Sequence, residues 1–257
     1  MEEKVVLIEK KDAVCTLIMN RPKVKNCFTM ETLLELQEAC CQIRSDKSIK
    51  VVVLEGAGGN FCSGSDVVYF RYMQGPPDFL EMMQNFNKII KDLRELPQPI
   101  ITKVRGVAVG GGANLALAGD FVLASDTAKF SQVFIKMNII PDGGGTYFLP
   151  RLVGLVKARE LAFLGDMIDG KTAQSIGLIY KSVPDEKLDE EVDSLAKNLS
   201  QRSLTALSLT KSCLERSFER SLDTCLEWEA AYQCVCSETE EHKEEVRRVW
   251  EPKGKHR

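Results

Sequence analysis

Three glycine-containing turns hold the residues of this 257-residue sequence whose types and spacing could do chemistry: 61–66, 110–112 and 141–146. Glycine has no side chain, so a ligand can approach the backbone closely, and a turn that opens a helix presents N–H groups at the positive end of the helix dipole. Fixed N–H groups of this kind stabilise an oxygen that becomes negatively charged during a reaction. For 110–112 alone, close packing is an equally good explanation, and the sequence around it fits neither a P-loop nor a dinucleotide-binding fingerprint.

A single acid, Asp142, stands among apolar residues directly before the glycines of the third turn. The local sequence alone favours helix capping over catalysis, because an acid before Gly-Gly-Gly-Thr suits an N-cap. Histidine is scarce: His242 and His256 are the only two, and both lie in the charged C-terminal part. Ser-His-Asp triads and His-ligated metal sites are therefore not expected, and proton chemistry must come mainly from carboxylates, with Lys or Tyr as outside candidates.

The composition is that of a globular protein able to bury a large core, with 44% hydrophobic and 28% charged residues. The nine cysteines are irregularly spaced and include no Cys-x-x-Cys pair, so we expect free thiols, a reducing compartment and no metal site. The net charge of −3 gives no reason to expect nucleic acid, and no apolar run is long enough to cross a membrane. Because Met-Glu-Glu-Lys lacks an apolar signal region, we expect a cytoplasmic protein.

The elements that must position these turns alternate between strands and helices over the first two-thirds of the chain. Short apolar runs predict strands, and two of them joined by Lys-Lys-Asp predict a hairpin. Helices are expected where apolar residues recur at helical spacing, with Thr29 and Thr172 as N-caps. The expected strands are 5–8, 13–19, 51–54, 99–104, 121–124 and 180–183, and the expected helices begin near 30, 79, 113, 156 and 172.

From residue 185 onward the pattern is only helical and increasingly charged. No stretch rich in Gly, Pro or Ser marks a linker between independent domains. The sequence therefore predicts an α/β core over 1–195 and a C-terminal helical region over 196–257. Residues 69–78, which contain Gly-Pro-Pro, are expected to form a mobile loop.

Taken together, several segments resemble the crotonase (enoyl-CoA hydratase/isomerase) superfamily. They are Asn-Arg-Pro at 20–22, the turn 61–67, the stretch 106–112 with Asp120 beyond it, the turn 141–146, and Leu-Pro-Arg-Leu-Val-Gly at 149–154. The resemblance covers nearly the whole chain in the family's order. It implies an α/β fold of repeated β-β-α turns in a right-handed spiral, followed by C-terminal helices that pack in a homotrimer or a dimer of trimers.

The resemblance also implies a substrate and a site. Members of this superfamily bind acyl-coenzyme A thioesters and stabilise a thioester enolate; coenzyme A is part of the substrate, and no permanently bound cofactor is implied. By position, the N–H groups of Ser65 and Gly111 would form the oxyanion hole. Asp66 would lie at the CoA side rather than act as the base. The implied CoA contacts are Val24, Lys25, Ser63, Gly64, Asp66 and Val67.

Two positions depart from the hydratases of the superfamily, which resemble one another in having two glutamates that activate water. Asn114 stands at the first position and Phe134 at the second. Asn114 is then either a buried amide bonded to backbone or a group that holds water or substrate, and Phe134 is either a pocket wall or a core residue. Neither takes a proton at neutral pH, so the two-carboxylate hydratase mechanism is not expected.

Asp142 remains, at a position where isomerases and a dehalogenase of the superfamily have an acid. The motifs are most similar to the single-aspartate isomerase branch of phenylacetate degradation, which makes Asp142 the implied acid and base of a double-bond shift. An unperturbed Asp has a pKa of about 3.9, and we expect an apolar wall of Phe130, Phe134, Ile139 and Ile140 to raise it. Hydration of a conjugated or cyclic dienoyl-CoA and non-catalytic acyl-CoA binding remain as alternatives.

Overall fold

The structure is a computed structural model that describes residues 4–250; His256 and residues 1–3 lie outside them. The strands of the main sheet are β1 (Val6–Lys11), β2 (Val14–Met19), β3 (Val51–Gly56), β4 (Ile100–Val104), β6 (Phe121–Ser125) and β9 (Lys181–Val183). They are hydrogen-bonded in the order β1-β2-β3-β4-β6-β9. All neighbours are parallel except β1 and β2, which form the hairpin predicted from the sequence, with Lys11 opposite Val14.

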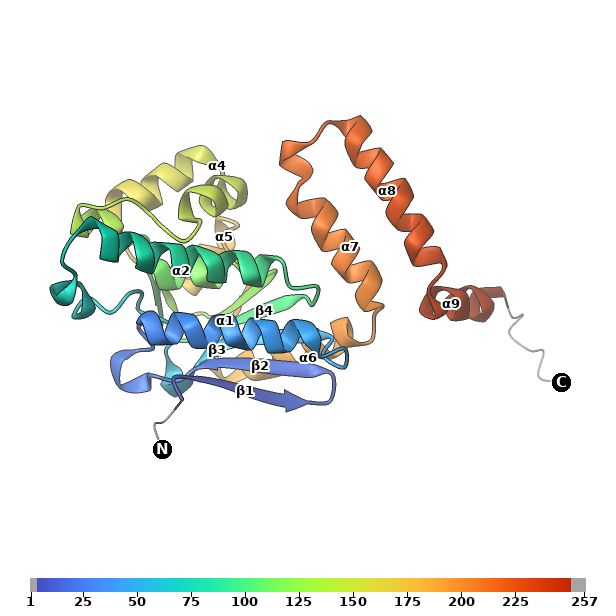
Figure 1. Ribbon diagram of the computed structural model, residues 1–257, viewed down its shortest axis with the longest axis horizontal. Helices are drawn as coiled ribbons and strands as arrows, with labels where there is room; N and C mark the ends of the chain where they lie inside the picture. The colour runs from blue at the N-terminus through green and yellow to red at the C-terminus, as the bar shows by residue number, and fades with distance from the viewer. Residues whose placement is uncertain (1–3, 251–257) are drawn as a thin grey trace.

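Both faces of this sheet are covered, because its central strands carry apolar side chains on each side. In β3, Val52 belongs to one core and Val53 to the other, as the two-residue period of a strand requires. The first face packs against α1 (Met30–Ser45) and α2 (Pro76–Arg94), which lie side by side (Figure 1). The second face packs against α6 (Leu188–Ser200). The sheet is therefore the middle layer of the core.

A smaller sheet connects the main sheet to the glycine turns. It consists of β5 (Val107–Val109), β7 (Lys129–Ser131) and β8 (Ile168–Asp169), in the order β5-β7-β8. The turn after β5 leads directly into α3 (Gly111–Leu117), and the turn that contains Asp142 leads into α4 (Gly145–Leu164). Two of the three glycine turns therefore lie at the start of a helix. The start of α3 agrees with the sequence, whereas the expectation of a helix beginning near 156 was wrong, because α4 already begins at Gly145 after the third turn.

The helix starts agree with the sequence in part. Thr29 caps α1 as predicted, but Asp169, not Thr172, caps α5 (Gly170–Ser175): its carboxylate accepts the Thr172 N–H at 2.8 Å. The prediction of Thr172 was wrong because β8 ends at Asp169, three residues before the N–H that needs a partner. In the expected loop 69–78, Tyr69–Tyr72 forms a short 3-10 helix and α2 already begins at Pro76.

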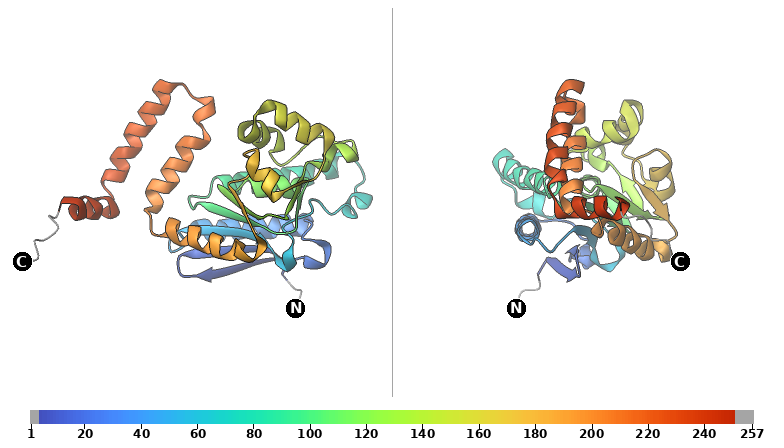
Figure 2. Two further views of the ribbon diagram at one scale, coloured as in Figure 1. Left: turned by 180° about the vertical axis from the view of Figure 1, so that it is seen from behind. Right: turned by 90° about the vertical axis from the view of Figure 1, so that its right-hand side faces the viewer.

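The C-terminal helices α7 (Leu204–Glu215), α8 (Leu222–Ser237) and α9 (Glu240–Trp250) extend to one side of the sheet (Figures 1 and 2). The expected boundary between 195 and 196 falls inside α6, whose Ala196 is buried against the sheet, so the projecting part begins with α7. An ion pair of 2.8 Å between Lys211 and Asp120 ties α7 to the core. The α/β core with a helical C-terminal region is thus confirmed. No helix within 4–250 is long and apolar enough to cross a membrane.

Candidate active site

The first two glycine turns lie against each other. Cys62 forms a parallel bridge with Ala108 of β5, and the Val109 N–H donates to the Cys62 carbonyl at 3.0 Å. Gly64 adopts a φ of +93°, and a methyl group added there would lie 2.9 Å from the Val109 oxygen and 3.6 Å from the Gly111 nitrogen. Only glycine combines that φ with so close an approach. The glycine at 64 therefore allows the two turns to come together.

This approach leaves the N–H groups of Ser65 and Gly111 available. Phe28 donates its N–H to the Gly64 carbonyl and accepts the Asp66 N–H, each at 2.9 Å. Because neighbouring residues of an extended chain point their N–H groups to opposite sides, the Ser65 N–H faces away from Phe28. Among residues 4–250, neither the Ser65 nor the Gly111 N–H donates to another backbone group. Two such amides can hold a developing oxyanion.

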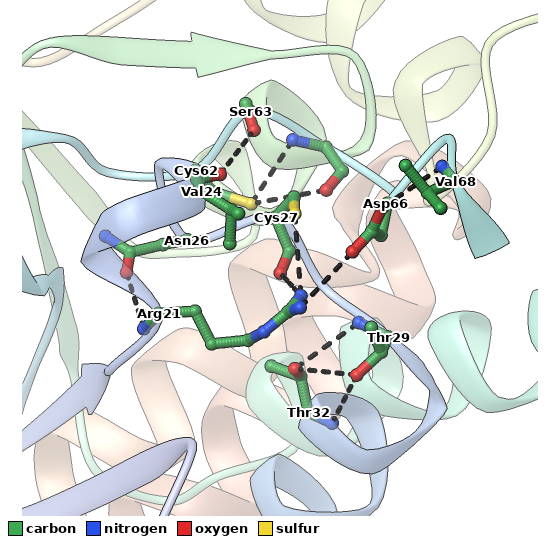
Figure 3. Close-up of polar contacts among 11 residues, drawn as sticks. Arg21, Val24, Asn26, Cys27, Thr29, Thr32, Cys62, Ser63, Asp66 and Val68 are labelled. Atoms are coloured by element: carbon green, nitrogen blue, oxygen red, sulfur yellow. Dashed lines mark hydrogen bonds and ion pairs between the residues drawn. The ribbon is translucent and has the colours of Figure 1, made fainter.

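Two of the residues expected to contact CoA, Val24 and Ser63, lie next to each other beside these turns (Figure 3). The Ser63 N–H donates to the Lys25 carbonyl at 3.0 Å, and the Ser63 hydroxyl lies 3.4 Å from the Val24 carbonyl. The side chains of Val24 and Val67 are exposed, so both stand at the surface of the molecule. The segment 24–25 and the segment that begins at Ser63, about forty residues apart in the sequence, thus form one edge of the candidate site. CoA binding there stays a prediction.

Asp66 is occupied by partners that hold the turn in place. Its carboxylate accepts the Val68 N–H at 3.1 Å and pairs with the Arg21 guanidinium at 3.2 Å (Figure 3). Arg21 also donates to the Cys27 carbonyl at 2.6 Å, so it connects the two segments of this edge. The sequence contained Arg21 in its Asn-Arg-Pro motif, but no local signal indicated this role.

Asp142 begins a tight turn whose geometry explains the glycines after it. The Gly145 N–H donates to the Asp142 carbonyl at 2.9 Å, and Gly143 and Gly144 have φ values of +51° and +82°. Two successive positive φ values define a type I′ turn, which strongly prefers glycine. The residue before α4 is Gly144, and no side chain of residues 4–250 caps this helix. The capping interpretation of Asp142 was therefore wrong.

The carboxyl group of Asp142 lies beside a cavity of about 500 Å³. Its Oδ1 is buried and has no hydrogen-bond partner among the described residues. Burial raises the pKa of Asp142 from 3.8 to about 6, with only a smaller opposing effect from a hydrogen bond to its own backbone. The carboxyl group can therefore both take and return a proton near neutral pH. The cavity is lined by Phe79, Met83, Asn87, Ile139, Ile140, Pro141, Asp142, Gly143, Gly144 and Thr146.

The expected apolar wall is only half correct. Ile139 and Ile140 line the cavity, but Phe130 and Phe134 do not. Both phenylalanines are buried elsewhere: Phe130 lines a separate small cavity, and the Phe134 ring would lie 3.9 Å from a methyl group added at Gly110. Phe79 and Met83 of α2 line the cavity instead. The reason is that α2 packs across this turn, which no pattern near Asp142 indicates.

A second apolar cavity continues from the first toward the segment after Asp66. It measures about 670 Å³ and shares Phe79 and Met83 with the cavity beside Asp142. Phe70 and Met73 also line it, so the segment 69–78 contributes to the surface next to the site. An extended apolar group could therefore run from Asp142 along α2.

Asn114 is fully buried, and both ends of its amide are used. Its Nδ2 donates to the Asp142 carbonyl at 2.7 Å, and its Oδ1 accepts from Gln132 Nε2 at 2.8 Å. Of the two roles considered from the sequence, the buried amide bonded to backbone agrees with this geometry. Gln132 was not singled out, although a glutamine between two phenylalanines in Phe-Ser-Gln-Val-Phe was a visible signal.

The aromatic rings of Phe28 and Phe86 connect the turns. The rings stack with centroids 4.6 Å apart. A methyl group added at Gly111 would lie 2.8 Å from Phe28 and 3.3 Å from Phe86, and one added at Gly143 would collide with Phe86. The turn that carries the Gly111 amide and the turn that carries Asp142 therefore rest on the same ring.

Known proteins are similar to this chain in sequence over nearly its full length. The family model described as enoyl-CoA hydratase/isomerase matches residues 9–256. The chain is 37% identical to a 1,2-epoxyphenylacetyl-CoA isomerase of Escherichia coli, over 94% of this chain and 93% of that protein. It is 31% identical to a crotonyl-CoA hydratase of Syntrophomonas wolfei, over 93% of this chain and 92% of that protein.

The fold is shared as well. The crystal structure of an enoyl-CoA hydratase from Bacillus anthracis is similar with a TM-score of 0.91 at 29% identity, over 95% of either chain. A TM-score this high over nearly all of both chains shows that the protein has the crotonase fold. Because the family model spans most of the sequence and the fold agrees over most of the structure, the chain belongs to the enoyl-CoA hydratase/isomerase family of enzymes.

Proposed function

We propose that this enzyme is an enoyl-CoA isomerase that shifts a double bond with Asp142 as its single acid and base. The observation that carries the proposal is the isolation of this carboxyl group. Asp142 is the one ionisable side chain among the residues that line its cavity, its Oδ1 has no partner within 4–250, and burial raises its pKa to about 6. A group of this pKa exchanges protons at neutral pH.

The reaction needs one base and one anion site. Asp142 takes a proton from C4 or C2 of the acyl chain, and the electron pair of the broken C–H bond delocalises onto the thioester oxygen. The N–H groups of Ser65 and Gly111 hold this dienolate oxygen. Asp142 then returns the proton to the other carbon, and the double bond moves. No water, oxidant or reductant is consumed.

The surroundings of Asp142 favour this reaction over two-carboxylate hydration. Asn114 occupies the position of the first hydratase glutamate and is bound at both ends, and Phe134 occupies the second and is buried. The E. coli relative is named an isomerase, which agrees with the proposal. The S. wolfei relative is named a hydratase, so hydration of a conjugated or cyclic dienoyl-CoA is the second candidate.

We place the two parts of the substrate on either side of the glycine turns. The CoA part would lie along Val24, Lys25 and Ser63, where exposed backbone and side chains meet. The acyl chain would pass Asp142 and enter the apolar cavities along α2. Coenzyme A thus arrives as part of the substrate.

We also propose that the working form is a homotrimer or a dimer of trimers. Large apolar side chains of the C-terminal helices are exposed in the single chain, and exposed apolar patches mark contact surfaces. They include Phe218, Leu222, Leu226, Val235, Val249 and Trp250.

The test is ultraviolet absorbance of the conjugated thioester after a 3-enoyl-CoA is mixed with the wild-type enzyme or with Asp142→Asn. We expect the absorbance band to grow with the wild type. With the variant, the rate of this growth should be roughly 100- to 10,000-fold lower, which is the usual contribution of a positioned acid or base. Affinity for the CoA thioester, measured by calorimetry, should stay nearly unchanged, because the CoA contacts lie elsewhere.

Other results would point elsewhere. A 3-hydroxyacyl-CoA product from a dienoyl-CoA would support the hydratase. Thioester binding without any turnover by the wild type would support a binding protein. Full activity of Asp142→Asn would show that another group is the base.

A further inference from the structure

We propose that Gln132 and Asn114 form a positioning relay that holds Asp142 at the reacting carbon. The relay deepens the proposed isomerase function and rests on it. Neither amide would touch the acyl chain; both act through the backbone of Asp142. They are positioning residues rather than catalytic ones.

The relay ends on the main chain of the base. The Asp142 carbonyl accepts two hydrogen bonds, from Asn114 Nδ2 at 2.7 Å and from the Gly145 N–H at 2.9 Å. A carbonyl oxygen has two lone pairs, so this acceptor is saturated. The peptide plane after Asp142 is thereby fixed from α3 on one side and from α4 on the other. Its Cα is fixed with it, which limits the positions that the carboxyl group can reach.

The direction of the relay follows from the hydrogen-bond inventory. Asn114 must turn its NH₂ group toward the Asp142 carbonyl, so its own oxygen faces Gln132, which must then donate through Nε2 at 2.8 Å. Asn114 and Gln132 are 0% and 4% exposed, so water does not compete for these bonds. Asp or Glu could not replace either amide, because an ionised carboxylate has no hydrogen to donate.

The close packing at Gly145 shows that this placement is specific. A methyl group added to Gly145 would lie 2.5 Å from Asn114 Nδ2. Any larger residue at 145 would therefore push the amide off the carbonyl. The third glycine of the Asp142 turn is explained by the relay, whereas the first two are explained by their positive φ values. Displacing a reacting group by about 1 Å can lower a rate about 100-fold.

The test uses three relay variants: Gln132→Met, Asn114→Leu and the double variant that combines them. Thr102→Val is measured beside them. Each relay variant removes buried hydrogen bonds at similar side-chain size. Thr102→Val is the matched control: it removes a fully buried hydrogen bond of 3.0 Å to the Ala116 carbonyl of the same helix α3, but nothing that leads to Asp142. In the isomerase assay we expect kcat to fall roughly 10- to 100-fold in the relay variants, with KM within about twofold of the wild type. The control should keep its kcat.

The double variant separates a relay from two independent supports. Because Gln132 acts through Asn114, the double variant should have the kcat of Asn114→Leu alone. Losses that multiply would overturn the relay. A fall in kcat for Thr102→Val equal to that of Gln132→Met would also overturn it, because general loosening of α3 would then explain both.

A second measurement does not depend on isomerase activity. The Asp142 carboxyl group is titrated by carbon NMR in the wild type, Gln132→Met and Thr102→Val. A freed turn exposes the carboxyl group to water, so its pKa should fall toward 3.8 in Gln132→Met only. An unchanged value would contradict the relay. A shifted value together with an inactive wild type would support the relay and reject the proposed isomerase function.

Discussion

Asp66 and Asp142 both belong to glycine turns, but their surroundings suit them to different tasks. The oxygens of Asp66 accept hydrogen bonds from Val68 and Arg21, so this carboxylate holds two segments together. Asp142 has a buried oxygen without a partner among the described residues, and desolvation raises its pKa to about 6. The contrast follows the general rule that environment decides whether a carboxyl group is structural or exchanges protons.

At the scale of single residues, Asp142→Asn should stabilise the folded protein at high pH while it removes activity. The pKa of Asp142 is about 6 in the folded chain against 3.8 in the reference state, so the folded chain binds its proton more tightly. The stabilisation from this proton is complete below about pH 4 and is lost as the pH rises through about 6. Above that pH the buried charge costs at most roughly 3 kcal/mol, at about 1.4 kcal/mol per pKa unit.

Urea unfolding at pH 8 and at pH 4 measures this difference. We expect the Asp142→Asn substitution to increase the free energy of unfolding at pH 8. At pH 4 it should change this free energy little, because Asp142 is protonated in the folded wild type. In the wild type, kcat/KM should rise with pH through about 6, since the base must be ionised to accept a proton. A variant less stable than the wild type at pH 8 would contradict the assigned burial of the charge.

At the scale of elements, the site depends on how closely the 61–66 turn approaches the strand-to-helix turn before α3. Gly64→Ala tests this approach, because the added methyl group would lie 2.9 Å from the Val109 oxygen. Gly59→Ala is the matched control: its φ of +78° imposes similar backbone strain, but no atom of the described part of the chain lies within 4 Å of the added methyl group.

Both variants should lose roughly 1–2 kcal/mol of stability from the left-handed backbone. Only Gly64→Ala should also lower kcat, by roughly 100-fold or more, because it would push apart the amides of Ser65 and Gly111 that we propose as the oxyanion hole. Thermal unfolding and steady-state kinetics on both proteins check this expectation. Equal kcat values would mean that the close approach of the two turns does not serve catalysis.

At the scale of the whole molecule, the chain consists of a covered sheet and helices that project from it. The main sheet is covered on both faces, and α7 is tied to the core by the ion pairs Lys211–Asp120 and Arg94–Glu215. None of the residues of α7, α8 and α9 is buried in the single chain, and no such ion pair to the core is found for α8 or α9 within 4–250. Helices with large exposed apolar residues are stable mainly when another surface covers them.

The double substitution Leu222→Lys and Leu226→Lys tests whether other copies of the chain cover α8. The two positions are one helical turn apart, on the same side of the helix. We expect light scattering to give the mass of three or six chains for the wild type and of one chain for the variant. Asp223→Lys, an exposed charged position of α8, should leave the assembly intact. A single-chain mass for the wild type would reject the proposed oligomer.

The sequence by itself was sufficient for what depends on local patterns. The apolar run of β3, the cap at Thr29 and the hairpin follow from the preferences of a few neighbouring residues, and the structure confirms them. Three glycine turns were recognisable in the same way, because glycine at close spacing marks backbone that must turn sharply or be approached closely. The resemblance built on those turns led to the correct family and fold.

Tertiary structure alone decided which side chains surround Asp142. Phe79 and Met83 enter its cavity because α2 packs across a turn some sixty residues later in the chain, while Phe130 and Phe134 turn into the core. The pairing of Asn114 with Gln132 likewise depends on the contact between α3 and the segment after β7. Such contacts follow from how distant elements pack together, and the spacing of residues along the chain carries no record of that packing.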